Sequence, residues 1–307
     1  MINYRVHRDL ARAITSVENG IADYRTTAAR LAQQGHERAG EGHASIIGVT
    51  GPPGAGKSTL VDRLIEGFRA NGETVAVIAV DPSSPFTQGA VLGDRVRMQR
   101  HAGDASVFIR SMASRTAGGG LAPATRDAVR LADAAGFDIV IVETVGVGQV
   151  ELEIVAVADV IVVVTVPALG DSVQTIKAGL TEIADIFVVN MADRPGANAT
   201  AVDLKHMVRE GKREIPVLQT IAQDGTGVSE LLEALQERRA AEDSNAVRAV
   251  RFELVRRARD QAVRSALAVL DSPDAAAVLD RLRAHELTRN DAIDALLPIL
   301  GGPVHAH

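Results

Sequence analysis

The chain has 307 residues, a formal net charge of −6, and 3% aromatic residues, and it contains no cysteine. With neither a basic surface nor aromatic stacking platforms, it is not expected to bind nucleic acid. The lack of cysteine excludes disulfides and thiolate metal sites and is typical of a cytoplasmic protein. The most apolar run, residues 160–169, is too short to span a bilayer, so we expect no membrane insertion.

The first expected element is an N-terminal helical arm over residues 1–43. Within residues 5–34, apolar side chains recur every three or four positions, which predicts an amphipathic helix or helix pair ending near Gly35. Residues 40–43 are typical of a linker. The repeating positions are Val6, Leu10, Ile14, Val17 and Ile21.

Residues 44–236 are predicted to form one α/β domain. Short β-rich runs alternate there with helical segments, which indicates a P-loop NTPase fold, a mostly parallel sheet flanked by helices. The runs at 138–143 and 159–165 are nearly continuous in β-branched residues and suit central strands, and ligands should bind at the carboxyl ends of the strands. The runs are 45–50, 74–80, 106–109, 137–143, 159–166, 185–190 and 215–221.

A phosphate-binding loop follows the first strand. Residues 51–58 fit the pattern G-x-x-x-x-G-K-[ST] and precede a helical segment, as this motif requires. Lys57 should reach the β and γ oxygens of a nucleoside triphosphate, and Ser58 should offer its hydroxyl to Mg²⁺. The residues expected to bind the nucleotide here are Gly51, Pro52, Pro53, Gly54, Ala55, Gly56, Lys57, Ser58 and Thr59.

Acidic residues at later strand ends are expected to complete the metal site. Asp81 ends the second strand, Asp94 follows in a segment rich in Gly, Ser, Thr and Gln, and Glu143 ends the strand that begins at residue 138. We expect these three carboxylates to serve Mg²⁺, and the Gly146 N–H to sense the γ-phosphate. A water-positioning glutamine would directly follow that glycine; Gln149 is the nearest substitute, so unaided hydrolysis should be slow.

The nucleotide base should be selected after the strand at 185–190. Asn190-Met191-Ala192-Asp193 resembles the Asn-Lys-x-Asp motif of GTPases, in which the Asp carboxylate accepts two hydrogen bonds from guanine. Met191 replaces the lysine, and its unbranched stem could still cover the base. Ala222 occupies the place where GTPases set a backbone N–H against guanine O6. GTP and GDP are therefore the expected ligands.

The residues after 236 are predicted to form a separate helical region, 237–307. Ser272-Pro273 and Thr288-x-x-Asp291 are typical of helix starts. The arginines of residues 248–264 could form a solvated helix face or could contact a second subunit or another protein.

Together, these motifs resemble the MeaB/ArgK-type GTPases, G-protein chaperones of adenosylcobalamin-dependent methylmalonyl-CoA mutase and its relatives. The resemblance covers nearly the whole chain. The segments that carry it are 51–58, 81–85, 92–98, 109–115, 119–122, 143–149 and 170–179.

The resemblance implies a switch that uses GTP to gate adenosylcobalamin loading into an acyl-CoA mutase and to protect or reactivate that enzyme. It also implies a C-terminal extension that pairs two subunits into a homodimer. Residues 170–179 correspond to an additional switch loop, with Asp171, Gln174 and Lys177 as its candidate working residues. The chain departs from the family pattern at Met191 and at Val150.

Three alternatives remain open at this point. A nickel or cobalt metallochaperone would need Cys or His ligands, and the eight histidines are scattered apart from His305 and His307. A kinase, in line with the older arginine-transport label of the family, would prefer ATP. The intact Lys57, Ser58 and Glu143 argue against a scaffold that binds nucleotide with little turnover, whereas Val147 and Met191 leave this alternative open.

Overall fold

The computed structural model describes residues 2–33, 43–82, 99–114, 123–144, 154–167, 183–209, 214–240 and, with short gaps, 250–300. The chain divides into two compact units, Met1–Ala249 and Val250–His307, and each is described by itself. Among the described residues, no helix is both long and apolar enough to cross a membrane.

The first unit is built on a seven-stranded parallel sheet in its described part, with strand order β3-β2-β4-β1-β5-β6-β7. Each predicted strand is present, which confirms the predicted fold class. Strands β4, β5 and β6 are buried along their whole length because helices cover both faces of the sheet. The strands are β1 (Ser45–Thr50), β2 (Val75–Pro82), β3 (Val107–Ser114), β4 (Ile139–Glu143), β5 (Val160–Thr165), β6 (Ile186–Asn190) and β7 (Val217–Thr220).

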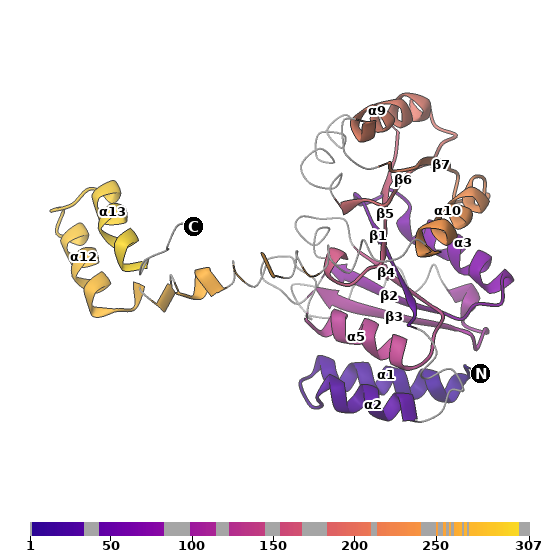
Figure 1. Ribbon diagram of the computed structural model, residues 1–307, viewed down its shortest axis with the longest axis horizontal. Coiled ribbons are helices and arrows are strands. Elements are labelled where there is room, and N and C mark those ends of the chain that lie inside the picture. Colours follow the sequence, from indigo (N-terminus) through magenta and orange to yellow (C-terminus); the bar gives the residue numbers. More distant parts are fainter. Residues whose placement is uncertain are drawn as a thin grey trace. The chain divides into compact units, whose positions relative to one another are not determined.

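Helices cover the sheet in layers (Figure 1). On one face lie α3 (Lys57–Ala70) and α10 (Val228–Ala240). On the other face lies α5 (Pro123–Ala134), which is covered in turn by α1 (Tyr4–Glu18) and α2 (Tyr24–Gln33). The predicted helix pair at the N-terminus is thus confirmed. A further helix, α9 (Ala197–Arg209), packs against β6 and β7.

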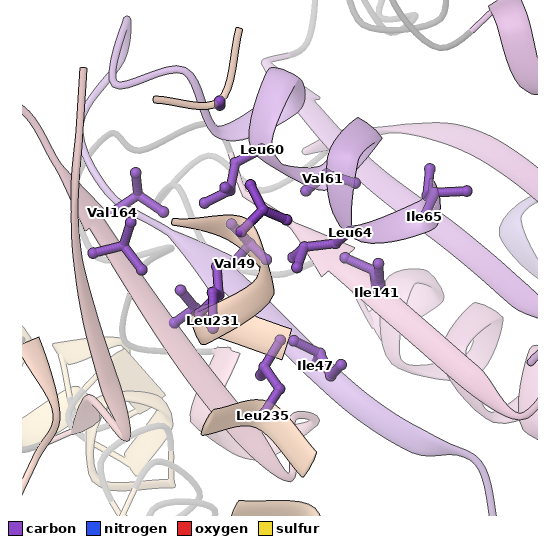
Figure 2. Close-up of a cluster of buried hydrophobic side chains, with 14 of the residues drawn as sticks. Ile47, Val49, Leu60, Val61, Leu64, Ile65, Ile141, Val164, Leu231 and Leu235 are labelled. Carbon is purple, nitrogen blue, oxygen red and sulfur yellow. The ribbon is translucent and has the colours of Figure 1, made fainter. Parts of the chain in front are cut away.

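The core between α3, α10 and the sheet lies directly beneath the phosphate loop. Figure 2 shows Leu60 and Leu64 of α3 meeting Leu231 of α10 and the strand residues Val49 and Val164. All five side chains are fully buried. Because α3 begins at the phosphate loop, this packing fixes where the loop sits relative to the strand ends.

Aspartates bind the start of the strands at the amino edge of the sheet. Asp138 directly precedes β4, and its carboxylate accepts hydrogen bonds from the N–H and the hydroxyl of Thr74, each at 2.8 Å. Asp159 precedes β5 and accepts from Ile46 N at 2.8 Å, and Asp185 precedes β6 and accepts from Ile161 N at 2.9 Å. These carboxylates satisfy N–H groups that the sheet leaves unpaired at its edge.

The strand expected at 106–109 continues to Ser114, because its residues pair in parallel with β2 as far as Pro82. The side chain of Arg110 donates to Glu18 of α1 at 3.0 Å and to Thr15 at 3.2 Å. The polar residues after position 109 are therefore compatible with a strand at the end of the sheet. The periodicity of the sequence alone does not predict that the strand continues through them.

The second unit contains α12 (Pro273–Arg283) and α13 (Arg289–Leu300), and both predicted helix starts are confirmed. Ser272 caps α12 by accepting from Ala275 N at 3.3 Å. Thr288 and Asp291 form the reciprocal bonds of a capping box at 3.2 and 3.0 Å. The expected boundary at residue 236 falls inside α10, whose Leu231 and Leu235 are buried in the core of the first unit.

Candidate nucleotide-binding site

The phosphate loop connects β1 to α3 with a backbone that requires glycine. Gly51 has φ +137°, and a Cβ added there would lie 1.9 Å from the carbonyl oxygen of Val164 in β5. Gly56 has φ +80°, and its Cβ would lie 2.4 Å from the side-chain nitrogen of Asn190. The loop therefore packs closely against the ends of β5 and β6. A side chain at Gly51 or Gly56 would push the loop away from these strand ends.

Gly56 also leaves the start of α3 without a side-chain cap among the described residues. The N–H groups of the first helical turn are those that an α-helix leaves without an internal partner, and the helix dipole is positive at that end. The loop Gly51–Gly56 and the first turn of α3 thus have the chemistry of an anion site.

Lys57 lies across this loop. Its ammonium group donates to the carbonyl oxygens of Gly51 at 2.7 Å and Pro52 at 3.0 Å, and the residue is 6% exposed. The ammonium is therefore held at the loop, where a strong positive charge can meet phosphate oxygens. Its role in phosphate binding stays a prediction.

Ser58 and Glu143 meet at the end of β4. The Ser58 hydroxyl donates to the Glu143 carboxylate at 2.6 Å, and both residues are buried. Next to them, the hydroxyl of Thr144 donates to that of Thr50 at 2.8 Å, which joins the ends of β4 and β1. The structure thus brings together a hydroxyl and a carboxylate oxygen, the donor types that Mg²⁺ prefers.

Asn190 joins the phosphate loop to the loop after β7. Its amide nitrogen donates to Ala55 O at 2.9 Å, and its amide oxygen accepts from the Thr220 hydroxyl and the Ala222 N–H, each at 3.1 Å. The residue is 2% exposed. The Ala222 N–H that the sequence assigns to guanine O6 therefore already bonds to Asn190 in this structure.

A pocket adjoins Asn190 and contains predicted nucleotide-binding positions from three parts of the chain. Asp193 is exposed at this pocket, whereas Met191 is partly buried against the core beside Gly56. Met191 has φ +56°, a left-handed conformation that is rare for such a residue and aims the side chain at the pocket lining. The lining consists of Gly56, Thr59, Asn190, Met191, Asp193, Arg194, Ile221, Ala222 and Gln223.

Several predicted site residues lie outside the described residues. Asp81 is the last residue but one of β2, at the same edge of the sheet as Glu143, and its side chain is among those not described. Six further residues that were predicted to serve the metal, hydrolysis or switching lie outside the described residues. They are Asp94, Gly146, Gln149, Asp171, Gln174 and Lys177.

The described geometry fits a nucleoside triphosphate with Mg²⁺. The loop and Lys57 supply donors for phosphate oxygens, Ser58 and Glu143 supply oxygen ligands for a hard cation, and Asp193 lies at the pocket beyond Asn190. Bound Mg²⁺ would supply neutralisation of phosphate charge. None of the described residues form a cluster of three or more metal-binding side chains.

Two contacts of this site were not anticipated from the sequence. The Thr50–Thr144 hydrogen bond depends on the parallel pairing of β1 with β4, which residue spacing does not reveal. Arg63 of α3 donates to the carbonyl oxygens of Ala222 and Gln223. The only available signal was that Arg63 lies four residues after Thr59 on a predicted helix, hence on the same face.

Comparison with known proteins agrees with this geometry. A family model described as methylmalonyl-CoA mutase-associated GTPase MeaB matches residues 10–275. A Pyrococcus abyssi protein named as a GTPase is 53% identical over 239 residues, which are 76% of this chain and 72% of that relative.

Two further relatives extend the comparison. A fused isobutyryl-CoA mutase of Cupriavidus metallidurans is 38% identical over 210 residues, which are 67% of this chain and 19% of the fused protein. The crystal structure of an LAO/AO transport system kinase matches with a TM-score of 0.63 at 26% identity, covering 95% of this chain and 97% of that one. The second match supports the P-loop NTPase architecture of the first unit.

Proposed function

Since this chain belongs to the methylmalonyl-CoA mutase-associated GTPase family, we propose that it is a GTP-binding and GTP-hydrolysing switch that acts on an adenosylcobalamin-dependent acyl-CoA mutase. The observation that carries the proposal is the side chain of Asn190, which bonds both to the phosphate loop and to the loop after β7. One residue thus sets the spacing between the phosphate and base ends of a single nucleotide site.

Within this site we assign Lys57 to the phosphates, Ser58 and Glu143 to Mg²⁺, and Asp193 with the loop at Ala222–Gln223 to guanine. Asp193 supports GTP over ATP because a carboxylate can accept two hydrogen bonds from the guanine N1–H and N2–H₂ groups, and adenine offers no such pair. The buried Ser58–Glu143 contact supports turnover, since a scaffold that only binds nucleotide would not need this pair. Hydrolysis should be slow in the isolated protein.

An acyl-CoA mutase is the proposed partner. The support is the family description together with a relative in which a segment similar to this chain belongs to a fused isobutyryl-CoA mutase. In this role the nucleotide state would gate the loading of adenosylcobalamin into the mutase and its protection or reactivation. Asp171, Gln174 and Lys177 are the residues we propose for transmitting that state.

We further propose a homodimer formed through the C-terminal region, in a chain whose helical arm and GTPase domain form the first unit and whose extension is the second unit, Val250–His307. Support comes from large apolar side chains that the second unit leaves exposed. Leu254 is 62% exposed, Val255 is 64% exposed and Leu297 is 55% exposed. Exposed apolar groups of this size are typical of a surface that is covered by another protein.

The test is steady-state GTP hydrolysis by the purified protein, alone and with the acyl-CoA mutase of the same organism, with ATP in parallel. We expect GTP turnover that rises when the mutase is added, and little ATP turnover. GTP binding without stimulation would contradict the mutase partner, and a preference for ATP would support the kinase alternative. Replacing Gln174 and Lys177 with alanine should reduce the stimulation and leave basal turnover unchanged.

A further inference from the structure

The loop after β7 is held by an arginine that lies outside the pocket. Arg63 is on α3, one turn after Thr59, which lines the pocket. The Arg63 Nε donates to Ala222 O at 3.0 Å, and Nη2 donates to Gln223 O. The same side chain therefore binds two consecutive carbonyl groups of the loop.

This loop segment is restrained from both sides. The Ala222 N–H donates to Asn190 on the pocket side, while the Ala222 carbonyl accepts from Arg63 on the α3 side. Ala222 is 3% exposed. Beyond it, Ile221 and Thr226 form a bridge that closes the turn. The position of the Ala222–Gln223 peptide in the pocket wall thus depends on two side chains, and the sequence pointed to only one of them.

The guanidinium group of Arg63 is itself fixed in orientation. Its third nitrogen, Nη1, donates to Glu66 at 2.9 Å. Glu66 also forms an ion pair with Arg100 at 2.7 Å, which limits where its carboxylate can lie. A planar fork with three separate acceptors is a geometry that lysine cannot reproduce, because its donors radiate from one atom.

We propose that Arg63 is a positioning residue for base selection: it holds the Ala222–Gln223 peptide so that the N–H of this peptide, which belongs to Gln223 and points away from the Ala222 carbonyl, can meet the O6 oxygen of a guanine base. The inference rests on the proposed function, since it assumes that a guanine nucleotide binds in this pocket. Arg63 acts through the loop backbone. Its loss should therefore weaken binding of bases that carry O6 and leave adenine binding unchanged.

A purely structural role would give a different result. If Arg63 only attached α3 to the rest of the first unit, its removal would lower stability without changing the choice of base. Arg69 is the matched control on the same helix. Its Nε donates to Asp104 at 2.8 Å and its Nη1 to Glu73 O at 2.8 Å, and its side chain is 25% exposed against 27% for Arg63.

The experiment compares Arg63→Met and Arg69→Met by calorimetric titration of the full chain with GDP, IDP and ADP. IDP keeps O6 and N1–H but lacks the 2-amino group. For Arg63→Met we expect GDP and IDP affinity to fall in parallel by roughly tenfold, with ADP affinity within about twofold of the wild type. The Arg69→Met protein should bind all three nucleotides as the wild type does.

An unchanged ratio of GDP to ADP affinity in Arg63→Met, or an equal fall of that ratio in Arg69→Met, would overturn the proposal. If Arg63→Met does not fold, Arg63→Lys decides: a smaller fall in the same ratio is expected, and an unchanged ratio would again overturn the proposal. A wild-type protein that shows no preference for GDP over ADP would instead contradict the proposed function, before any variant is measured.

Discussion

Strand β4 has a carboxylate at each end, and the two have different surroundings. Asp138, before the strand, accepts hydrogen bonds from Thr74, which begins the neighbouring segment of the sheet. Glu143, the last residue of the strand, accepts from the hydroxyl of Ser58 in the first turn of the phosphate-loop helix. The first carboxylate completes the sheet, and the second faces a loop with the chemistry of an anion site.

The difference follows from the direction of a parallel sheet. The amino ends of all strands meet at one edge, where the first N–H groups of the strands need acceptors outside the sheet. All carboxyl ends meet at the other edge, where loops such as 51–56 leave for the next helix and the helix starts point their N–H groups inward. An acidic residue therefore supports the fold at one edge and is available for chemistry at the other.

The largest expected effect is at the carboxyl edge. Lys57→Ala should weaken GTP and GDP binding by roughly a hundredfold or more, because it removes the charge that the loop carbonyls hold beside the phosphate site. Titration with a fluorescent GDP analogue measures this. Lys205→Ala, at an exposed position of α9, is the control and should bind normally. Normal nucleotide affinity in Lys57→Ala would sink the phosphate-loop assignment.

The second prediction compares the two ends of β4 directly. Glu143→Gln should lower kcat for GTP by roughly a hundredfold while the protein stays folded, since a metal ligand loses its charge. Asp138→Ala should leave kcat unchanged and lower the free energy of unfolding by about 1 kcal/mol, because two partly buried donors on Thr74 lose their acceptor. Hydrolysis assays and denaturant melts of both variants check this. Loss of activity in Asp138→Ala with unchanged stability would reverse the comparison.

The third prediction concerns the base end of the same edge. Asp193→Asn should reduce the preference for GTP over ATP by about tenfold or more, because an amide cannot accept both guanine hydrogen bonds. Competition binding with both nucleotides gives the ratio. Asp203→Asn, at an exposed position of α9, serves as the control. An unchanged ratio in Asp193→Asn would mean that the base site lies elsewhere.

The smallest expected effect is a pH dependence of the stability of the fold, caused by His7 of α1. Burial among Phe108 and Phe137 lowers the pKa of His7, against the opposing effects of the Ala105 backbone and Asp104. As the pH falls below the ordinary histidine pKa of about 6.5, His7 is therefore protonated in the unfolded chain before it is protonated in the folded protein. Stability should be full above that pH and should decline as pH falls below it.

Thermal melts of the wild type and His7→Leu across this pH range measure the effect. The variant should lose part of the decline on acidification, whereas His206→Leu, at an exposed position of α9, should keep it. An identical pH profile in wild type and His7→Leu would show that His7 does not contribute to the decline.

Much of the fold could be predicted because its signals are local. The apolar, β-branched run at 138–143 predicts a strand without information from the rest of the chain. The glycine pattern of residues 51–56 likewise predicts a phosphate-binding loop. The extent of β3 could not be predicted, because residues 110–114 are a strand through their pairing with β2, and Arg110 finds its partner Glu18 on α1, far away in the sequence. Likewise, α10 continues past residue 236, where Arg238 donates to the carbonyl oxygen of Glu214 and Arg239 donates to the carboxylate of Glu73.

The site divides in the same way. Lys57, Ser58 and Asn190 were identified from motif spacing, and the structure places them around one loop. Met191 was noted as a departure from the guanine motif, but its left-handed backbone and its place in the pocket lining follow from the folded turn.

By itself, the sequence determined the elements, their alternation and the residue types of the phosphate loop, because these depend on neighbours along the chain. Only the tertiary structure decided that Asp138, Asp159 and Asp185 bind the starts of neighbouring strands, that Glu143 accepts from Ser58, and that Arg63 reaches the loop after β7. Those contacts join residues 24 to 160 positions apart, as in the Asp185–Ile161 and Arg63–Gln223 pairs. Such pairs form only when strand order and helix packing bring distant segments together, and residue spacing carries no record of that order.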